Sequence, residues 1–189
     1  QHFLMLQTLS KFLLYKCMGW KKDVRFKLPK KAIICLAPHT SNWDFLIGQL
    51  YAEAEGLRGN FLMKKEWFIG PLGLFFRKLG GIPVYRDKHT SMTDRLAEMA
   101  KEVDKFQLCI TPEGTRSLNS NWKMGFYYIA KKANLPIFLY GLDYERKLIA
   151  CTKFINPSGD IDTDIQDIKS YFKDFKGKYP ELFTVGEIG

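Results

Sequence analysis

Apolar runs suited to buried strands alternate along the chain with amphipathic segments suited to helices. Strands are predicted over 32–37, 60–63, 82–85, 107–111 and 135–142, and helices over 42–55, 66–79, 90–105 and 122–133. Regular alternation of this kind is typical of a mostly parallel sheet covered by helices. With 189 residues, 46% of them hydrophobic, and no repeats, the chain fits a single α/β domain with a full core.

Two segments extend this pattern toward the C-terminus. The stretch from Lys147 to Cys151 predicts a further strand, which could run antiparallel to the one before it. Five apolar residues then recur at helical spacing and predict a helix packed on the core: Ile161, Ile165, Ile168, Phe172 and Phe175. We divide the chain into a basic N-terminal segment with an amphipathic helix, 1–30, and a domain, 31–189.

A histidine and an aspartate stand where the first predicted strand ends. His39 follows the apolar run 32–37, and Asp44 lies five positions later at the start of an amphipathic segment. Extended backbone would hold the two apart by roughly 17 Å, and a continuous helix would point them about 140° apart. A strand-to-helix turn can bring them together, and Ser41 and Asn42 are good caps for such a helix. Because an imidazole oriented by a carboxylate can accept a hydroxyl proton, the pair is a candidate catalytic dyad.

The same H-x4-D spacing occurs a second time, at His89 and Asp94. There the histidine follows the charged residues 86–88 and opens an amphipathic helix. A solvated histidine and a carboxylate at a helix N-terminus are the ordinary interpretation of that context. We therefore predict that the first string carries the chemistry.

The loop over 111–117 places a carboxylate, a flexible backbone and a guanidinium side by side. It follows the predicted strand 107–111 and contains Glu113, Gly114 and Arg116. Arginine can bind a phosphate through two parallel hydrogen bonds, and glycine lets backbone amides approach an anion. Taken alone, this loop could equally be a β-turn with a Glu–Arg pair on the surface.

In their order and spacing, these segments resemble the glycerophosphate acyltransferase superfamily, in particular the bacterial 1-acyl-glycerol-3-phosphate (lysophosphatidate) acyltransferases. The family's H-x4-D block falls on His39 and Asp44, and its E-G-T-R block falls on residues 113–116. Its G-x-I-x-V-x-R block, with the lysine-rich stretch before it, falls on Lys64, Lys65, Glu66, Gly80, Ile82, Val84 and Arg86. Together these matches cover most of the chain.

The resemblance implies a glycerolipid acyltransferase fold and an O-acyltransferase of phospholipid biosynthesis. His39 is then the general base that removes the proton of an acceptor hydroxyl, and Asp44 orients it. The hydroxyl oxygen attacks the thioester of an acyl-CoA or an acyl-carrier protein, and no metal or other cofactor takes part. The residues that hold the acceptor and its phosphate are then Lys64, Arg86, Glu113, Gly114, Thr115 and Arg116.

Two departures from the family pattern leave the acyl acceptor open. The chain has Pro38 where the family usually has Asn, and Thr111 where it usually has Phe. Lysophosphatidate is the leading acceptor, and another lyso-lipid, for example one built on an amino acid, is the alternative. A basic lipid-binding protein without catalysis is a further alternative, against which the complete dyad and loop argue.

The basic excess of +9 is concentrated near the N-terminus. From Lys11 to Lys31 there are eight lysines and arginines and a single acid, Asp23, near apolar residues such as Leu9 and Trp20. The pattern fits an interfacial helix on anionic lipid about as well as a packed helix with a solvated basic face. Since no segment reaches transmembrane length and no signal peptide is evident, we expect a cytoplasmic protein peripherally bound to the inner face of the membrane.

Three remaining features narrow the alternatives. Aromatic residues cluster with aliphatic ones rather than alternating with Lys and Arg, which argues against a nucleic-acid-binding module. The stretch 67–76 is apolar almost all round and could line an acyl-chain tunnel, touch the bilayer or form a buried helix. The cysteines lack metal-ligand spacing and are expected to be reduced and structural: Cys17, Cys35, Cys109 and Cys151.

Overall fold

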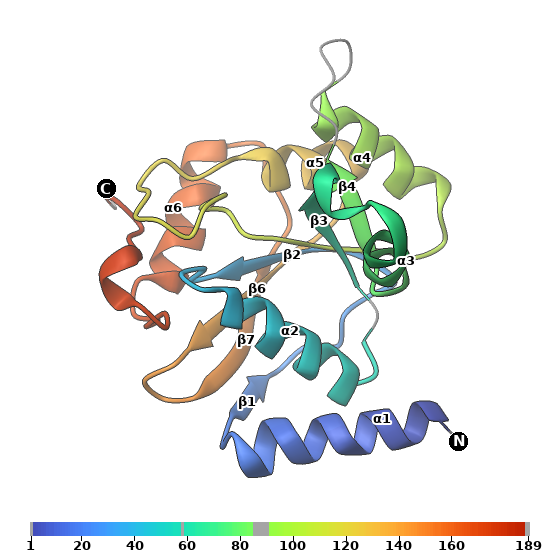
Figure 1. The fold of residues 1–189 in the computed structure, drawn as a ribbon. Coiled ribbons are helices and arrows are strands. Elements are labelled where there is room, and N and C mark those ends of the chain that lie inside the picture. Colours follow the sequence, from blue (N-terminus) through green and yellow to red (C-terminus); the bar gives the residue numbers. More distant parts are fainter. Residues whose placement is uncertain (1, 58, 85–90, 188–189) are drawn as a thin grey trace.

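A single sheet organises the chain (Figure 1). The structure, a computed structural model, describes residues 2–57, 59–84 and 91–187. Within these residues seven strands pair in the order β1-β7-β6-β2-β5-β3-β4. They are β1 (Lys21–Val24), β2 (Lys31–Ala37), β3 (Asn60–Lys64), β4 (Gly81–Val84), β5 (Phe106–Ile110), β6 (Ile137–Asp143) and β7 (Leu148–Ile155).

The sheet is parallel from β4 through to β6, as the alternating sequence pattern predicts. At the other edge β7 returns antiparallel to β6, and β1 pairs parallel to β7. The predicted mostly parallel α/β fold is therefore confirmed, and the antiparallel strand is where its sequence placed it. The sequence did not predict β1, which adds a short strand from the basic N-terminal segment to the sheet.

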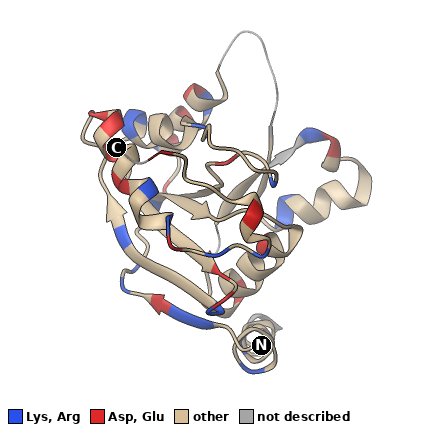
Figure 2. Cartoon of the chain, turned by 90° about the vertical axis from the view of Figure 1, so that its left-hand side faces the viewer, with Lys and Arg blue, Asp and Glu red and all other residues tan. Residues whose placement is uncertain are grey.

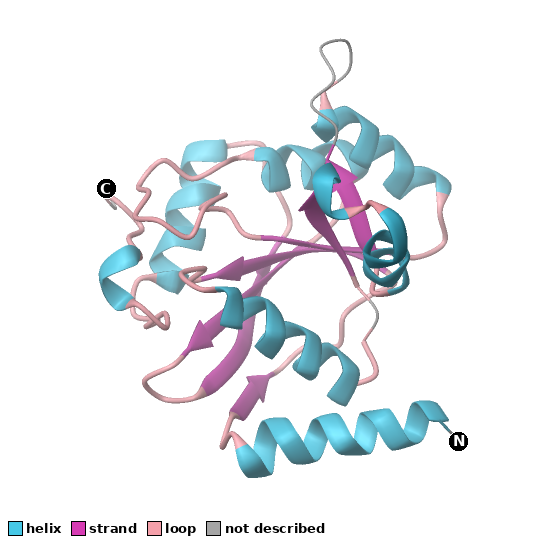
Figure 3. Ribbon diagram, in the orientation of Figure 1, coloured by secondary structure: helices cyan, strands magenta, loops and turns pink. Residues whose placement is uncertain are grey.

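Six α-helices are described, and Figure 3 shows them on both faces of the sheet. They are α1 (His2–Lys11), α2 (Asn42–Ala54), α3 (Gly70–Lys78), α4 (Met92–Glu102), α5 (Gly125–Ala133) and α6 (Ile161–Phe172). A π-helical segment, Phe12–Cys17, continues α1, and short 3-10 turns occupy Lys65–Trp67 and Pro180–Leu182.

Each face of the sheet has its own hydrophobic core. On one face, Ile33 and Cys35 of β2 pack with residues of α4, α5 and α6, among them Phe172. On the other face, Ala32 of β2 packs with Ile47 of α2 and other residues of that helix. This alternation along β2 is the period of two that a strand covered on both faces requires.

The N-terminal helix packs against α2 through part of its surface only. Leu14 is fully buried, and the side-chain amide of Gln7 donates to the carbonyl of Ala54 at 3.1 Å. Tyr15 and Lys22 both bind the carboxylate of Glu55, just beyond α2, at 2.6 Å. The remaining apolar side chains face solvent: Leu4, Met5, Leu6, Leu9, Phe12 and Leu13. Among the described residues, no helix combines the length and apolar character needed to cross a bilayer.

The apolar stretch 67–76 does not form a buried helix, so that alternative is wrong. Helix α3 lies at the β4 edge of the sheet, where it is covered on one side only (Figure 1). Five large side chains of the stretch, on α3 and just before it, are exposed instead: Trp67, Ile69, Leu72, Leu74 and Phe75. The chain therefore presents two exposed apolar helix surfaces, one on α1 and one on α3.

Candidate active site

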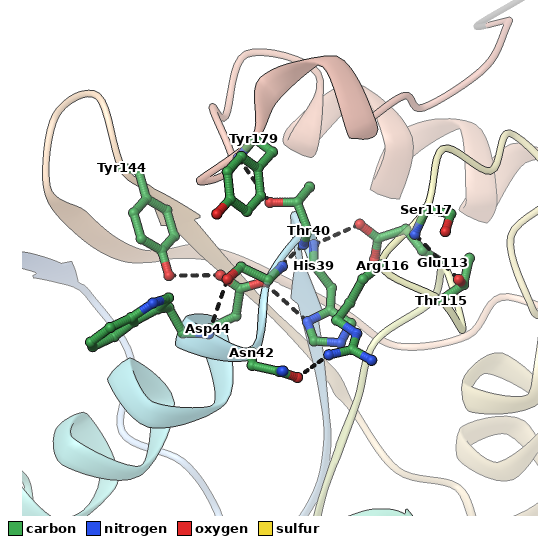
Figure 4. A network of polar contacts seen from close by, with 12 residues as sticks. His39, Thr40, Asn42, Asp44, Glu113, Thr115, Arg116, Ser117, Tyr144 and Tyr179 are labelled. Atoms are coloured by element: carbon green, nitrogen blue, oxygen red, sulfur yellow. Dashed lines mark hydrogen bonds and ion pairs between the residues drawn. The ribbon is translucent and has the colours of Figure 1, made fainter.

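The ends of three parallel strands meet at one edge of the sheet. Strands β2, β5 and β6 run in the same direction, so the residues that follow them lie at a common edge. His39 follows β2, Glu113 follows β5 and Tyr144 follows β6. Chain segments about a hundred residues apart are thus brought together (Figure 4).

His39 and Asp44 form the pair that their spacing predicts. The chain turns from β2 into α2, and Nδ1 of His39 lies 3.1 Å from Oδ2 of Asp44. The aspartate side chain is 1% exposed and the histidine side chain 22% exposed. Because the carboxylate accepts a hydrogen bond from Nδ1, that nitrogen carries the proton of the ring, and Nε2 is left to accept a proton.

The same carboxylate caps the helix that carries it. Oδ2 of Asp44 accepts the backbone N–H groups of Thr40 at 2.8 Å and Ser41 at 2.9 Å. Ser41 in turn accepts the N–H of Trp43 at 3.1 Å, which completes a reciprocal capping box at the start of α2. Asp44 is therefore fixed by the backbone of the turn that bears His39.

Glu113 supports the histidine loop from the neighbouring strand. Its Oε1 accepts the backbone N–H of His39 at 2.7 Å, and its backbone carbonyl accepts from Asn119 at 2.8 Å. Its Oε2 is buried and has no hydrogen-bond partner among the described residues. Burial raises the pKa of the Glu113 carboxyl above its ordinary value. Glu113 is thus an internal brace of the site rather than half of a surface Glu–Arg pair.

Arg116 borders an open cavity beside the dyad. The cavity, of about 440 Å³, is lined by residues of the histidine turn, the Glu113 loop and the C-terminal segment: Thr40, Ser41, Asn42, Trp43, Arg116, Ser117, Tyr179 and Leu182. The guanidinium of Arg116 donates to the side-chain oxygen of Asn42 and is otherwise exposed. An exposed guanidinium at the wall of such a cavity can meet an anionic group bidentately.

The remaining predicted site residues lie in the loop after Glu113, at the end of β3, or outside the described residues. Gly114, with a φ of +66°, makes the bend that follows Glu113, and Thr115 accepts the N–H of Ser117 at 3.2 Å in a local turn. Lys64 ends β3, whose carboxyl end faces the same edge of the sheet. Arg86 lies outside the described residues.

The aspartate of the second H-x4-D string, Asp94, has the structural role that its sequence context predicts. Asp94 lies in the first turn of α4, where its backbone N–H is bound by the cap Ser91, and its carboxylate pairs with Lys132. Its side chain is 44% exposed, in contrast to the enclosed Asp44. His89 lies outside the described residues.

The sequence did not indicate the residues that close the site from the C-terminal side. Tyr144 donates its hydroxyl to Oδ1 of Asp44 at 2.7 Å, and the N–H of Tyr179 donates to Oγ1 of Thr40 at 3.2 Å. Gly177 lies so near the turn that an added Cβ would come within 2.8 Å of Oγ1 of Thr40. None of these residues stands at a recognisable spacing from His39, so only the fold could reveal them.

A second cavity, mostly apolar and of about 390 Å³, runs beside α2. Asp44 and Phe45 line it near the dyad, Gly48 lies along it, and Leu57 lines it beyond the other end of the helix. Residues 78–80 contribute to its wall, but the stretch 67–76 does not. The dyad therefore lies between an open cavity with an exposed arginine and a mostly apolar one.

Neither the thiol of Cys35 on β2 nor that of Cys109 on β5 is suited to nucleophilic attack. Burial raises the pKa of Cys109 to about 12, and burial also raises that of Cys35. Both thiols therefore stay protonated near neutral pH, and the imidazole is the basic group of the site.

The fold has a solved counterpart. The structure is similar to that of a 1-acyl-sn-glycerophosphate (LPA) acyltransferase, PlsC, from Thermotoga maritima, with a TM-score of 0.57 and 17% sequence identity. The similarity covers 83% of this chain and 70% of the other. No curated protein sequence matches the chain.

A family model described as Acyltransferase matches residues 21–139, which is more than half of the chain. The chain therefore belongs to the acyltransferase family. This finding and the shared fold confirm the resemblance to the glycerophosphate acyltransferase superfamily. Tyr144 and the segment around Gly177 lie beyond the matched residues.

The raised pKa of Glu113 predicts a pH-dependent difference between the protein and its Glu113→Gln variant. A carboxyl whose pKa is higher in the folded state loses its stabilising contribution as the pH rises through that value. The glutamine keeps an oxygen for the N–H of His39 and carries no charge. Thermal unfolding from pH 4 to pH 8 should therefore show a stability gain of the variant that is smallest at low pH and increases with pH. A difference that is constant across this range would contradict the ionisation of a buried Glu113.

Proposed function

We propose that the protein transfers a fatty acyl group from a thioester donor to the free hydroxyl of lysophosphatidate. The observation that carries the proposal is the His39–Asp44 pair, held between a cavity with an exposed arginine and an apolar cavity. Membership of the acyltransferase family supports acyl transfer as the reaction. The lyso-lipid acceptor is the part that goes beyond family membership.

In the proposed reaction, Nε2 of His39 removes the proton of the acceptor hydroxyl as the oxygen attacks the thioester carbonyl. The tetrahedral intermediate then collapses with cleavage of the C–S bond, and the departing thiolate takes the proton from the imidazolium, which leaves a free thiol and a neutral His39. Asp44 stabilises the imidazolium between these steps. Because the attacking oxygen belongs to the acceptor, neither an acyl-enzyme nor a cofactor is needed, and the donor is an acyl-CoA or an acyl-carrier protein.

The two cavities suggest where each substrate binds. Arg116, together with Lys64 and Arg86, would bind the acceptor phosphate and so position the hydroxyl near His39. The apolar cavity beside α2 would take the acyl chain, whose burial is favourable in proportion to its apolar area. A guanidinium binds a carboxylate as readily as a phosphate, which keeps an amino-acid lyso-lipid as the alternative acceptor.

The dyad is tested by replacing each histidine of the two H-x4-D strings. Loss of a general base typically lowers the rate by about a hundredfold or more, so His39→Ala should abolish transfer while His89→Ala leaves it nearly intact. Mass spectrometry of the products formed from a panel of phosphate- and amino-acid-based lyso-lipids measures both rate and acceptor. Equal losses of activity in the two variants, both folded, would contradict the assignment of His39 as the base. If only amino-acid lyso-lipids gave product, they would be the acceptor in place of lysophosphatidate.

The acyl-chain cavity is tested by filling it. A Cβ at Gly48 would have nothing within 4 Å, so a leucine there extends into the space lined by this residue. Gly48→Leu should lower turnover of long-chain donors severalfold while a butyryl donor is used normally. Leu46→Phe, which adds bulk at an exposed position of the same helix, is the control. An unchanged chain-length profile in Gly48→Leu would remove the cavity from the donor site.

We also propose that the protein binds the membrane surface through the exposed apolar side of α1 and its neighbouring lysines. The apolar residues from Leu4 to Leu13 would enter the interface, while Lys11, Lys16 and Lys21 would meet anionic headgroups. Figure 2 shows the lysines of β1 beside this helix. The exposed surface of α3 is a second candidate contact.

Charge reversal separates this role from simple packing. Each lysine near an anionic bilayer contributes about 1 kcal/mol, so changing Lys11, Lys16 and Lys21 to Glu should strongly weaken co-sedimentation with phosphatidylglycerol vesicles. Lys22 is left unchanged because its ion pair with Glu55 holds the segment. The matched control changes three exposed lysines elsewhere to Glu: Lys105, Lys131 and Lys173. Equal effects of the two triple variants would exclude a specific N-terminal contact and favour α3.

A further inference from the structure

Tyr144 reaches the aspartate of the dyad from the turn that follows β6. It lies in the turn between β6 and β7, and its hydroxyl donates to Oδ1 of Asp44 at 2.7 Å (Figure 4). His39 and the two backbone N–H groups bind the other oxygen, Oδ2. Each oxygen of this enclosed carboxylate thus has its own donors.

The turn that carries Tyr144 is fixed before any substrate binds. Asp143, which is fully buried, accepts the backbone N–H of Arg146 at 2.8 Å and its Nε at 2.9 Å. The N–H of Tyr144 donates to the carbonyl of Lys176 at 2.8 Å, and its ring lies edge-on to that of Trp20, with centroids 5.0 Å apart. The phenol is therefore aimed at Asp44 by contacts on several sides.

The Tyr144 hydroxyl stays protonated near neutral pH and therefore remains a hydrogen-bond donor. Burial, and then the hydrogen bond to Asp44, raise the pKa of Tyr144 well above its ordinary value. Besides His39, the ionisable groups around this pair include Glu113, which braces the histidine loop, and Lys178, whose ammonium lies over the Tyr144 ring. A buried carboxylate oxygen without a donor is costly, and within the part of the chain that the structure describes Oδ1 has the Tyr144 hydroxyl as its donor.

We propose that Tyr144 is a positioning residue for the acyl-transfer reaction. Its hydroxyl holds Oδ1 of Asp44 in place, so that Oδ2 stays aligned with Nδ1 of His39 while the imidazole gains and loses its proton. The inference rests on the proposed function, because it takes His39 to be the base. It predicts an effect on turnover and none on substrate binding, since the phenol is directed at Asp44.

The test is the Tyr144→Phe variant, assayed with the acceptor and donor that the wild-type protein uses. Loss of a hydrogen bond to a charged group should lower kcat by about tenfold with both KM values almost unchanged. The thermal midpoint should fall as well, because buried Oδ1 loses its donor, so kcat is measured well below that midpoint. Tyr171→Phe is the matched control, because that tyrosine accepts the N–H of Thr152 at 3.2 Å in a structural contact. An unchanged kcat in Tyr144→Phe, or a raised acceptor KM at normal kcat, would overturn the proposal.

A double-mutant cycle with Asp44→Asn shows whether the tyrosine acts through the aspartate. In the asparagine variant there is no charge for the phenol to hold, so adding Tyr144→Phe should lower kcat by less than twofold further. Losses that multiply in full would mean that Tyr144 acts elsewhere, and the proposal would fail. His39→Ala is included in the same series. If it retains activity, the proposed function and this inference both fail, whereas an inactive His39→Ala beside a fully active Tyr144→Phe rejects the inference alone.

Discussion

The site depends on the buried carboxylate of Asp44, which accepts the hydrogen bonds that hold it together. The backbone hydrogen bonds at the start of helix α2 and the one that orients His39 end on the same oxygen, Oδ2. A change that disturbs the N-terminal cap of α2 therefore also disturbs His39, because both are held by the Asp44 carboxylate. The H-x4-D spacing has a simple physical meaning in this chain: it is the length of a strand-to-helix turn whose cap faces back toward the preceding loop.

Parallel strand order determines what surrounds this turn. The strands β5 and β6 flank β2, so the loops after them approach the dyad from opposite sides. One side supplies Glu113 and Arg116, and the other supplies Tyr144. The apolar cavity lies along α2, so the helix that carries the aspartate also forms a wall of that cavity. A polar cavity wall and an apolar one thus lie on either side of the same pair of residues.

Local sequence patterns predicted the elements that have local causes. The apolar run before His39 and the cap at Ser41 indicated β2 and α2, and the contrast between the two H-x4-D strings was visible in their flanking residues. Strand β1 was missed because its four residues, Lys21–Val24, are mostly polar and are held by pairing with β7. The apolar stretch 67–76 was ambiguous because hydrophobicity alone does not say whether a helix is covered by the protein. Tyr144 was out of reach because its contact with Asp44 spans 100 positions.

The close approach of Gly177 to the histidine turn has a consequence for the order in which the protein is made. The turn and the Glu113 loop leave the ribosome early, but the chain that covers Thr40 follows only with residues 177–179. Domains fold as units once enough of the chain has emerged. A nascent chain that ends after the family-matched residues 21–139 still lacks β7, α6 and this cover, so the site is completed only after residues 177–179 have emerged. Premature acyl transfer by a partly made chain is thereby disfavoured by topology alone.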